Sequence, residues 1–139
     1  MTVQFYDAVE DSLLKFAVIV SKSNGKWVFC KHKERDTYEC PGGHREEGEN
    51  IFDTAKRELY EETGATEYSL KPVCVYSVTS CGVETFGMLY FAEIGSFEKE
   101  LHSEIEKVEL FEGLPEKWTY PLIQPLLIKE VQRRGYDEI

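Results

Sequence analysis

The sequence predicts an α/β protein with a central mixed β-sheet between helices, an α/β/α sandwich. Two observations favour this class. Short runs of β-branched and aromatic residues lie on both sides of one segment with helical periodicity, and a second helix-like segment ends the chain. The 139 residues have the length of one domain, so we expect a single domain over residues 1–139.

The first half of the chain is expected to contain a β-hairpin. The run Leu13 to Ser21 suits a largely buried strand, and Lys26 to His32 suits its partner. Asn24-Gly25 lies between them and favours a hairpin turn, because both residues tolerate positive φ. The first twelve residues show no clear period and could form an edge strand or an arm.

A short polar connection leads from this hairpin to the first helix. Lys33 to Thr37 is expected to be a loop, and Tyr38 to Cys40 is expected to be extended because Pro41 follows it. Gly42 and Gly43 then let the backbone turn sharply and approach a ligand closely. Gly42 and Gly43 are therefore candidate substrate-binding residues.

The first helix has clear start and stop signals. Asn50 is the expected N-cap, and Gly64 is the expected residue after the last helical turn. Phe52, Ala55 and Leu59 lie at i, i+3 and i+7 and form an apolar stripe that would pack on a sheet. The glutamates of this helix are then expected to face away from the sheet.

The second half is expected to add three strands and a helix. Lys71 to Ser80 and Glu84 to Ile94 suit an antiparallel hairpin that turns near Cys81-Gly82. Gly95 to Ser103 is polar and is expected to be a loop, and Lys107 to Phe111 suits the last strand.

A C-terminal helix is expected from Tyr120 onwards, over the run PLIQPLLIKEVQRR. Pro121 and Pro125 are tolerated there only if both fall in or before the first turn. The expected core face of this helix consists of Leu122, Leu126, Ile128 and Val131.

Charge and cysteine content exclude several classes of partner. The 16 basic and 26 acidic residues give a net charge of −10, so a nucleic acid is not the expected partner. The four cysteines form no C-x-x-C pair and no secretory signal is seen, so we expect reduced thiols in a cytoplasmic protein. No run reaches the ~18 apolar residues of a membrane span.

Three carboxylates crowd one face of the first helix. Glu58, Glu61 and Glu62 lie at i, i+3 and i+4, and no matching row of Lys or Arg accompanies them. Like charges at this spacing repel, so a bound cation is the natural compensation. Oxygen-only ligands indicate a hard divalent ion, Mg²⁺ or Mn²⁺.

The segment around these carboxylates has a fixed frame of specified residues. Gly43 is followed after five residues by Glu49, and seven residues later come Arg57-Glu58-Leu59, then Glu61-Glu62 and Gly64-Ala65. This frame resembles the Nudix box of the Nudix hydrolase superfamily, and every defining position is filled. The expected strand order and the Pro-Gly-Gly before the box also look like the fold of that family.

The resemblance implies a reaction and a set of roles. Nudix hydrolases cleave a nucleoside diphosphate linked to another group, by water attack on phosphorus assisted by Mg²⁺ or Mn²⁺. By matching position, Glu58, Glu61 and Glu62 would be catalytic metal ligands, and Glu61 or Glu62 would also orient the water. Arg57 would be a structural residue that donates a charge-assisted hydrogen bond to Glu49. Alternatively, Glu49 would bind the metal indirectly.

The family often adds a carboxylate from a distant loop, as a further metal ligand or general base. Glu104 is the candidate for this catalytic role because it lies just before the last expected strand, and Glu106 is the competitor. His32 and His44 could contact phosphate, although an ordinary surface role is the simpler interpretation. Cys40 is expected to be a small core side chain.

The substrate is left open by the resemblance. The short domain, with Tyr38-Glu39 before Pro-Gly-Gly, looks most like mutator-type enzymes, which hydrolyse nucleoside triphosphates such as 8-oxo-dGTP to a monophosphate and pyrophosphate. Where those enzymes carry a purine-binding asparagine, this chain has Thr119-Tyr120. Tyr38 is the candidate substrate-binding aromatic, and others that could stack on a base are Phe5, Tyr76, Phe86 and Tyr120, each a core residue by default.

Other functions remain as alternatives. The substrate could be a dinucleoside polyphosphate, a nucleotide sugar, ADP-ribose or capped RNA, although the marker proline of many ADP-ribose hydrolases is missing and the negative charge disfavours RNA. A non-catalytic nucleotide-binding Nudix module is the alternative from another class. Many members of the family dimerise, so a homodimer is also open.

Overall fold

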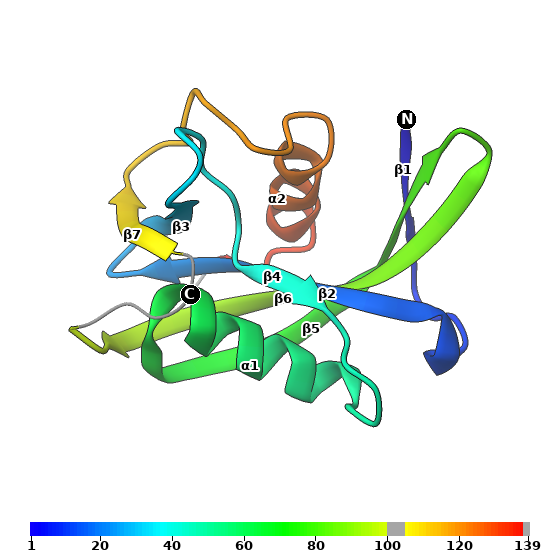
Figure 1. The fold of residues 1–139 in the computed structure, drawn as a ribbon, viewed down its shortest axis with the longest axis horizontal. Helices are drawn as coiled ribbons and strands as arrows, with labels where there is room; N and C mark the ends of the chain where they lie inside the picture. Colours follow the sequence, from blue (N-terminus) through cyan, green and yellow to red (C-terminus); the bar gives the residue numbers. More distant parts are fainter. Residues whose placement is uncertain (100–104, 138–139) are drawn as a thin grey trace.

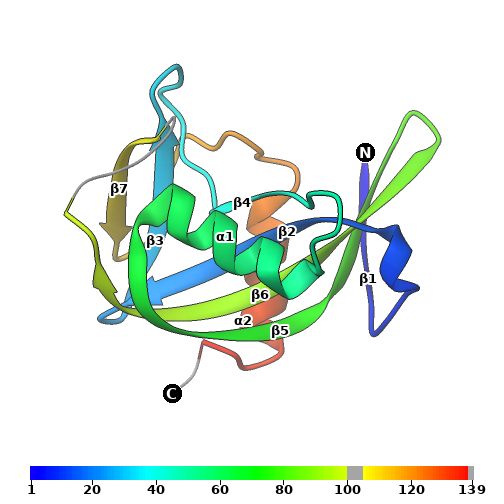
Figure 2. The same ribbon diagram turned by 60° about the horizontal axis from the view of Figure 1, so that its bottom comes forward.

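A mixed β-sheet forms the centre of the molecule, with one helix on each face (Figures 1 and 2). The computed structural model describes residues 1–99 and 105–137. The strands are β1 (Thr2–Tyr6), β2 (Leu14–Ser23), β3 (Lys26–His32), β4 (Gly42–His44), β5 (Ala65–Ser80), β6 (Val83–Phe97) and β7 (Ile105–Phe111). The helices are α1 (Ile51–Thr63), α2 (Gln124–Arg133) and a short 3-10 turn, η1 (Asp11–Leu13).

Strand β2 organises the sheet. The strand order is β1-β5-β6-β2-β3-β7, and β4 pairs with β2 beside this path. β2 runs parallel to β6, while it is antiparallel to β4 at its start and to β3 at its end. The expected mixed sheet is confirmed, and the first residues form an edge strand that pairs with β5.

The two faces of the sheet carry separate cores. Along β2, Ala17 and Ile19 point toward α1, whereas Val20 points to the opposite face, where α2 packs. The α1 core includes Ala55 and Leu59 of that helix. This alternation produces the predicted three-layer arrangement, with α1 and α2 on opposite sides of the sheet (Figure 2).

The predicted hairpin turns are confirmed, but the second hairpin is longer than expected. Positive φ occurs at both residues of each turn, Asn24-Gly25 and Cys81-Gly82. β5 begins directly after α1, and β6 continues to Phe97, so the expectation of a loop from Gly95 was wrong for its first three residues. These residues pair with the start of β5, which satisfies their backbone groups. Glu98 and Lys99 follow the strand as irregular chain, and the remaining part of the expected loop, 100–103, lies outside the described residues.

The expectation of a sharp turn at Gly42-Gly43 was wrong. Both residues lie in the extended strand β4, and neither has a positive φ. A Cβ atom on Gly42 would lie 2.5 Å from the Ala17 carbonyl oxygen, and one on Gly43 would overlap the Glu58 carboxylate. The two glycines therefore let β4 fit tightly between β2 and α1.

Helix α1 begins and ends as predicted, but its buried face is displaced. Asn50 accepts a hydrogen bond from the backbone N–H of Asp53, and Gly64 has φ of 75°. Phe52 is 40% exposed, whereas Glu58 is buried. The glutamates therefore do not all face away from the sheet, because α1 also packs against the short strand β4 and turns its Glu58 side inward.

The core face of α2 was only half predicted. The helix begins at Gln124 with Pro125 in its first turn, and Pro121 precedes it, so both prolines fall where they are tolerated. Leu122 and Leu126 are exposed, because Leu122 lies in the turn before the helix. Ile128 and Val131 are buried as expected, together with Leu127.

All four cysteines are free thiols, as expected, and only Cys81 is exposed. Across residues 1–99 and 105–137, no helix has both the length and the apolar character needed to cross a bilayer.

Candidate active site

Arg57 on α1 connects the carboxylates of the acidic segment. Its Nε and Nη2 atoms donate to the two oxygens of Glu49 at 2.8 and 3.1 Å. Nη1 donates to Glu58 Oε1 at 2.8 Å, and Nη2 also donates to the backbone oxygen of His44 at 2.9 Å. Glu61 lies at the edge of this network, 3.4 Å from Nη1. One guanidinium thus joins the loop after β4 to the acidic face of α1.

This network fixes the charge of Glu49. Hydrogen bonds from Arg57 and from the Thr54 hydroxyl lower the pKa of Glu49 to about 2. Glu49 in turn raises the pKa of Arg57 further above its usual range. Both groups are therefore charged at neutral pH, and their bidentate geometry makes the pair a rigid part of the loop.

Glu58 is held in a tight space between Arg57 and β4. Burial raises the pKa of Glu58 to about 7, against the opposing effect of Arg57, and the nearby Glu61 adds to the rise. The missing side chain of Gly43 provides the room that this carboxylate occupies. A buried carboxylate in contact with other carboxylates favours a compensating cation.

Glu62 points from α1 toward β3 and β4. Its Oε1 accepts a hydrogen bond from the backbone N–H of Gly42 at 2.8 Å, and its Oε2 lies 3.3 Å from His32 Nε2. Burial raises the pKa of Glu62 to about 8, although the Gly42 N–H opposes this, and Glu58 and Glu39 contribute to the rise. His32 also lies 3.4 Å from Glu39, so the imidazole sits between two carboxylates.

The three helix carboxylates thus have different partners. Glu58 and Glu61 contact Arg57, whereas Glu62 contacts β4 and His32. Within residues 1–99 and 105–137, no three acidic, histidine or cysteine side chains converge into a preassembled metal cage. The donor set nevertheless fits a hard divalent cation, because it supplies only carboxylate oxygens and two of these groups are buried with raised pKa values.

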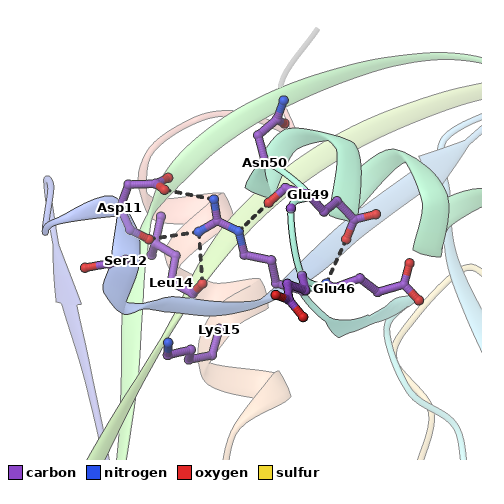
Figure 3. A pocket seen from close by; sticks show the side chains of 10 residues that line it. Asp11, Ser12, Leu14, Lys15, Glu46, Glu49 and Asn50 are labelled. Carbon is purple, nitrogen blue, oxygen red and sulfur yellow. Dashed lines mark hydrogen bonds and ion pairs between the residues drawn. The ribbon is translucent and has the colours of Figure 1, made fainter.

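A second arginine holds the loop from its other side (Figure 3). Arg45 Nε donates to the backbone oxygen of Glu49 at 2.7 Å, and Nη2 donates to Asp11 Oδ2 at 2.8 Å. Nη1 donates to the backbone oxygens of Asp11 and Leu14. These contacts line a surface pocket between η1 and the loop, so Glu49 is bound through its backbone by Arg45 and through its carboxylate by Arg57.

A cavity of about 380 Å³ opens beside the acidic face of α1. Its wall contains the charged and polar side chains of His32, Arg35, Glu39, His44 and Glu62. The rest of the wall is mainly apolar and includes residues of α2. The residues there are Phe16, Val18, Tyr76, Val78, Ile123 and Leu127, accompanied by Thr85, Tyr120 and Gln124.

Comparison with known proteins identifies the family. A model of the NUDIX domain matches residues 12–113, which is well over half of the chain. The chain belongs to the Nudix family. It therefore carries the fold and the motif of a Nudix hydrolase, with α1 as the helix of the Nudix box.

A curated relative and a solved structure, both from Bacillus subtilis, are similar to this chain over most of its length. YtkD from strain 168, named as a candidate 8-oxo-dGTP diphosphatase, is 32% identical over 134 residues, which cover 89% of this chain and 84% of YtkD. The crystal structure of the pyrophosphohydrolase BsRppH superposes with a TM-score of 0.81 and 29% identity, covering 98% of this chain and 93% of that one. A Nudix hydrolase from Nitrosomonas europaea shares the fold, with a TM-score of 0.70 and 20% identity over 86% of this chain and 89% of that one.

Several residues that the sequence named as site candidates are not in the wall of the 380 Å³ cavity. Tyr38 is not in the cavity wall, since its ring packs against Phe111 and its hydroxyl donates to Glu109. Glu104 lies outside the described residues. Glu106 is an exposed residue that forms a 2.8 Å ion pair with Lys31. Phe5 and Phe86 are also absent from the cavity wall, whereas Tyr76 and Tyr120 line it.

His32 and His44, which the sequence named as possible phosphate contacts, both line the cavity. The structure also places there three residues that the sequence did not single out. Arg35, Glu39 and Gln124 come from the connection after β3 and from the start of α2. Only the position of Glu39 before Pro-Gly-Gly was a usable signal, because Arg35 lies in an expected polar loop and Gln124 lies far from the Nudix box in sequence.

Proposed function

We propose that this Nudix protein hydrolyses a nucleoside triphosphate to the monophosphate and pyrophosphate, with Mg²⁺ or Mn²⁺ as cofactor. One observation carries the proposal: a single cavity has both Glu62 of the acidic face of α1 and an apolar surface that includes α2 in its wall. A triphosphate and a nucleobase need such unlike surroundings within one site.

The charged residues at the cavity suit the phosphates once a cation is bound. Glu58, Glu61 and Glu62 would hold the cation, with Glu104 as a proposed additional ligand and general base. A divalent ion there neutralises phosphate charge and lowers the pKa of bound water. Arg35 stands in the same wall as a further positive group, and Tyr120 and Glu39 beside it raise its pKa.

The chain's own residues hold the acidic side chains in place. Arg57 fixes Glu49 and Glu58, and the backbone N–H of Gly42 fixes Glu62. Glu61 is 43% exposed at its side chain, which leaves it accessible to orient an attacking water. Gly43 keeps the space beside Glu58 clear of a side chain.

The apolar part of the wall suits a nucleobase, because Phe16 and Tyr76 supply aromatic surface to it. YtkD, which is named for 8-oxo-dGTP, supports an oxidised purine nucleotide as the substrate. We therefore place 8-oxo-dGTP first among the nucleotides to test.

The test is a screen of the purified chain with 8-oxo-dGTP, dGTP, the common triphosphates, ADP-ribose, a dinucleoside polyphosphate and a nucleotide sugar. Pyrophosphate and phosphate release are measured with Mg²⁺ and with EDTA. We expect pyrophosphate release from a triphosphate with Mg²⁺ alone, and near-complete loss in Glu61→Gln and Glu62→Gln. Glu116→Gln, in an exposed loop, is the matched control and should retain activity.

Cleavage of only a non-triphosphate substrate would replace the proposed substrate class. Full activity in EDTA, or in both glutamine variants, would refute the role given to the helix carboxylates. Circular dichroism of each variant shows whether the fold persists.

A further inference from the structure

Arg45 is a partly buried arginine at the start of the connection between β4 and α1. Residues 45–50 of this connection contain no apolar side chain, so hydrophobic packing of their own side chains cannot hold them in place. The Arg45 side chain is nonetheless only 18% exposed. It lines the surface pocket between η1 and the connection and is not in the wall of the 380 Å³ cavity (Figure 3). The path of the connection therefore depends on polar contacts.

Three backbone oxygen atoms accept hydrogen bonds from the Arg45 guanidinium. Nε donates to the oxygen of Glu49 at 2.7 Å, and Nη1 donates to those of Asp11 and Leu14 at 2.9 and 3.3 Å. Nη2 donates to Asp11 Oδ2, and the backbone N–H of Arg45 donates to the Lys15 oxygen at 2.8 Å. A backbone oxygen moves only with its chain. These contacts therefore fix the end of the connection relative to η1 and the start of β2.

Glu49 is the residue at which the contacts of Arg45 meet those of Arg57. Arg45 holds the Glu49 backbone oxygen, while Arg57 and Thr54 hold its carboxylate. Arg57 Nη1 in turn donates to Glu58 Oε1 at 2.8 Å. A continuous series of contacts thus leads from Arg45 to the Glu58 carboxylate.

We propose that Arg45 is a positioning residue for the metal-binding carboxylates, which holds the Glu49 backbone so that Arg57 stays oriented toward them. This inference rests on the proposed function, because Glu58 and Glu61 are metal ligands only in that proposal. Arg45 lies outside the cavity wall, so other residues transmit its effect to the site.

Loss of Arg45 should make the site less preorganised. Without the bond to the Glu49 backbone, the connection can adopt more conformations, and Arg57 is then less often oriented toward Glu58. Groups that orient metal ligands from behind typically contribute about 10- to 100-fold to metal affinity or activity. Arg45 acts one residue further from the ligands, so we expect the lower end of this range, a loss of about tenfold.

Binding of Mn²⁺ alone tests the proposal without turnover. Electron paramagnetic resonance measures free Mn²⁺ during titration of the metal-free protein, for wild type, Arg45→Met and Arg45→Lys. Arg45→Met should weaken Mn²⁺ binding about tenfold. Arg45→Lys keeps a cationic donor for one of the backbone oxygens, so it should recover part of the loss and bind about threefold more weakly than wild type. If Arg45→Met does not fold, Arg45→Lys provides the same comparison.

Arg134→Met is the matched control for a loss of stability. Arg134 is 25% exposed and donates from Nε to Glu130 at 2.7 Å at the C-terminal end of α2. Its replacement should lower the urea midpoint but leave the Mn²⁺ affinity within about twofold of the wild-type value, because the two regions are independent. A purely structural role of Arg45 would give this same result for Arg45→Met.

A double variant tests the path through Arg57. In an Arg57→Met background, Arg45→Met should weaken Mn²⁺ binding by less than about a further twofold, because the contact through which it acts is already lost. A further loss as large as the one in the wild-type background would overturn the proposal.

Steady-state kinetics on the best triphosphate gives an independent readout. At saturating Mg²⁺, Arg45→Met should lower kcat about tenfold and change KM for the nucleotide by less than about twofold, because Arg45 is not in the cavity wall. A change in KM with an unchanged kcat would contradict a positioning role.

The Mn²⁺ titration also separates this proposal from the hydrolase proposal. If wild type binds Mn²⁺ and Arg45→Met binds it equally well, or if Arg134→Met loses as much affinity, the role of Arg45 is refuted whatever the substrate screen shows. If Arg45→Met loses affinity as expected but no triphosphate is cleaved, the role of Arg45 stands and the proposed reaction is refuted. A wild type that does not bind Mn²⁺ would refute the metal site on which both depend.

Discussion

Replacement of Arg57 by methionine is predicted to destabilise the protein and to inactivate it through the same lost contacts. The variant loses two hydrogen bonds to Glu49 and one each to Glu58 and the His44 backbone oxygen. Methionine has a helix propensity similar to that of arginine, so the helix itself is preserved. The loss therefore reports on the network alone.

The magnitude follows from the burial of the three side chains. Arg57 is 23% exposed, Glu49 14% and Glu58 12%, so the network lies between a surface ion pair and a buried one. Surface pairs contribute about 0–1 kcal/mol, and breaking a buried pair costs about 3–5 kcal/mol. We expect the free energy of unfolding to fall by about 2 kcal/mol.

Urea denaturation at pH 7 measures this loss, with a midpoint shift of about 1 M. Lys56→Met, one residue earlier on the same helix, is the matched control. Its pair with Asp53 is 3.6 Å long and about half exposed, so its loss should cost less than about 0.5 kcal/mol.

A double variant, Arg57→Met with Glu49→Gln, tests whether the clamp acts as a unit. The two costs should be clearly less than additive, because each single change already breaks the same bidentate contact. Additive costs, or a cost for Arg57→Met no larger than that for Lys56→Met, would refute the reasoning.

Three further predictions concern the carboxylates and the glycines. The pKa values of Glu58 and Glu62 in the folded state lie near 7 and 8, above the ordinary value for a glutamate, so the folded state binds protons that the unfolded state does not. The free energy of unfolding of the metal-free protein should therefore fall as the pH rises from about 5 to 8. Thermal denaturation measures this fall, and Mg²⁺ should restore the stability at pH 8. Gly43→Ala should displace the Glu58 carboxylate and lower kcat at least about tenfold, whereas Gly113→Ala, with open space around it and no positive φ, serves as the comparison for stability. Gly87→Ala would place a Cβ 2.6 Å from Phe16 and should raise KM by narrowing the cavity, which steady-state kinetics would show; an unchanged KM would contradict this.

The sequence was sufficient for the fold and for the helix of the Nudix box. The caps at Asn50 and Gly64 and the turns at Asn24-Gly25 and Cys81-Gly82 depend on local chemistry, so they could be predicted residue by residue. The hydrophobic runs likewise indicated the strands that the structure contains.

Features that depend on contacts between distant segments could not be predicted. Gly42 and Gly43 looked like a turn because the spacing gives no sign that β4 is wedged between β2 and α1. His32 and Gln124 carry no motif, and they reach the cavity only because β3 and the start of α2 meet beside the Nudix box. Tyr38 shows the converse, since its aromatic ring packs on Phe111 of β7 and stays out of the cavity wall.

The central claim is that the chain cleaves a nucleoside triphosphate between its α and β phosphates with the help of a divalent cation. Phosphorus NMR of the products from the best triphosphate of the screen, recorded with Mg²⁺, tests this most directly. The account predicts nucleoside monophosphate and pyrophosphate in equal amounts, and no reaction in Glu62→Gln. Nucleoside diphosphate with inorganic phosphate, or an unchanged triphosphate in the wild-type sample, would contradict it.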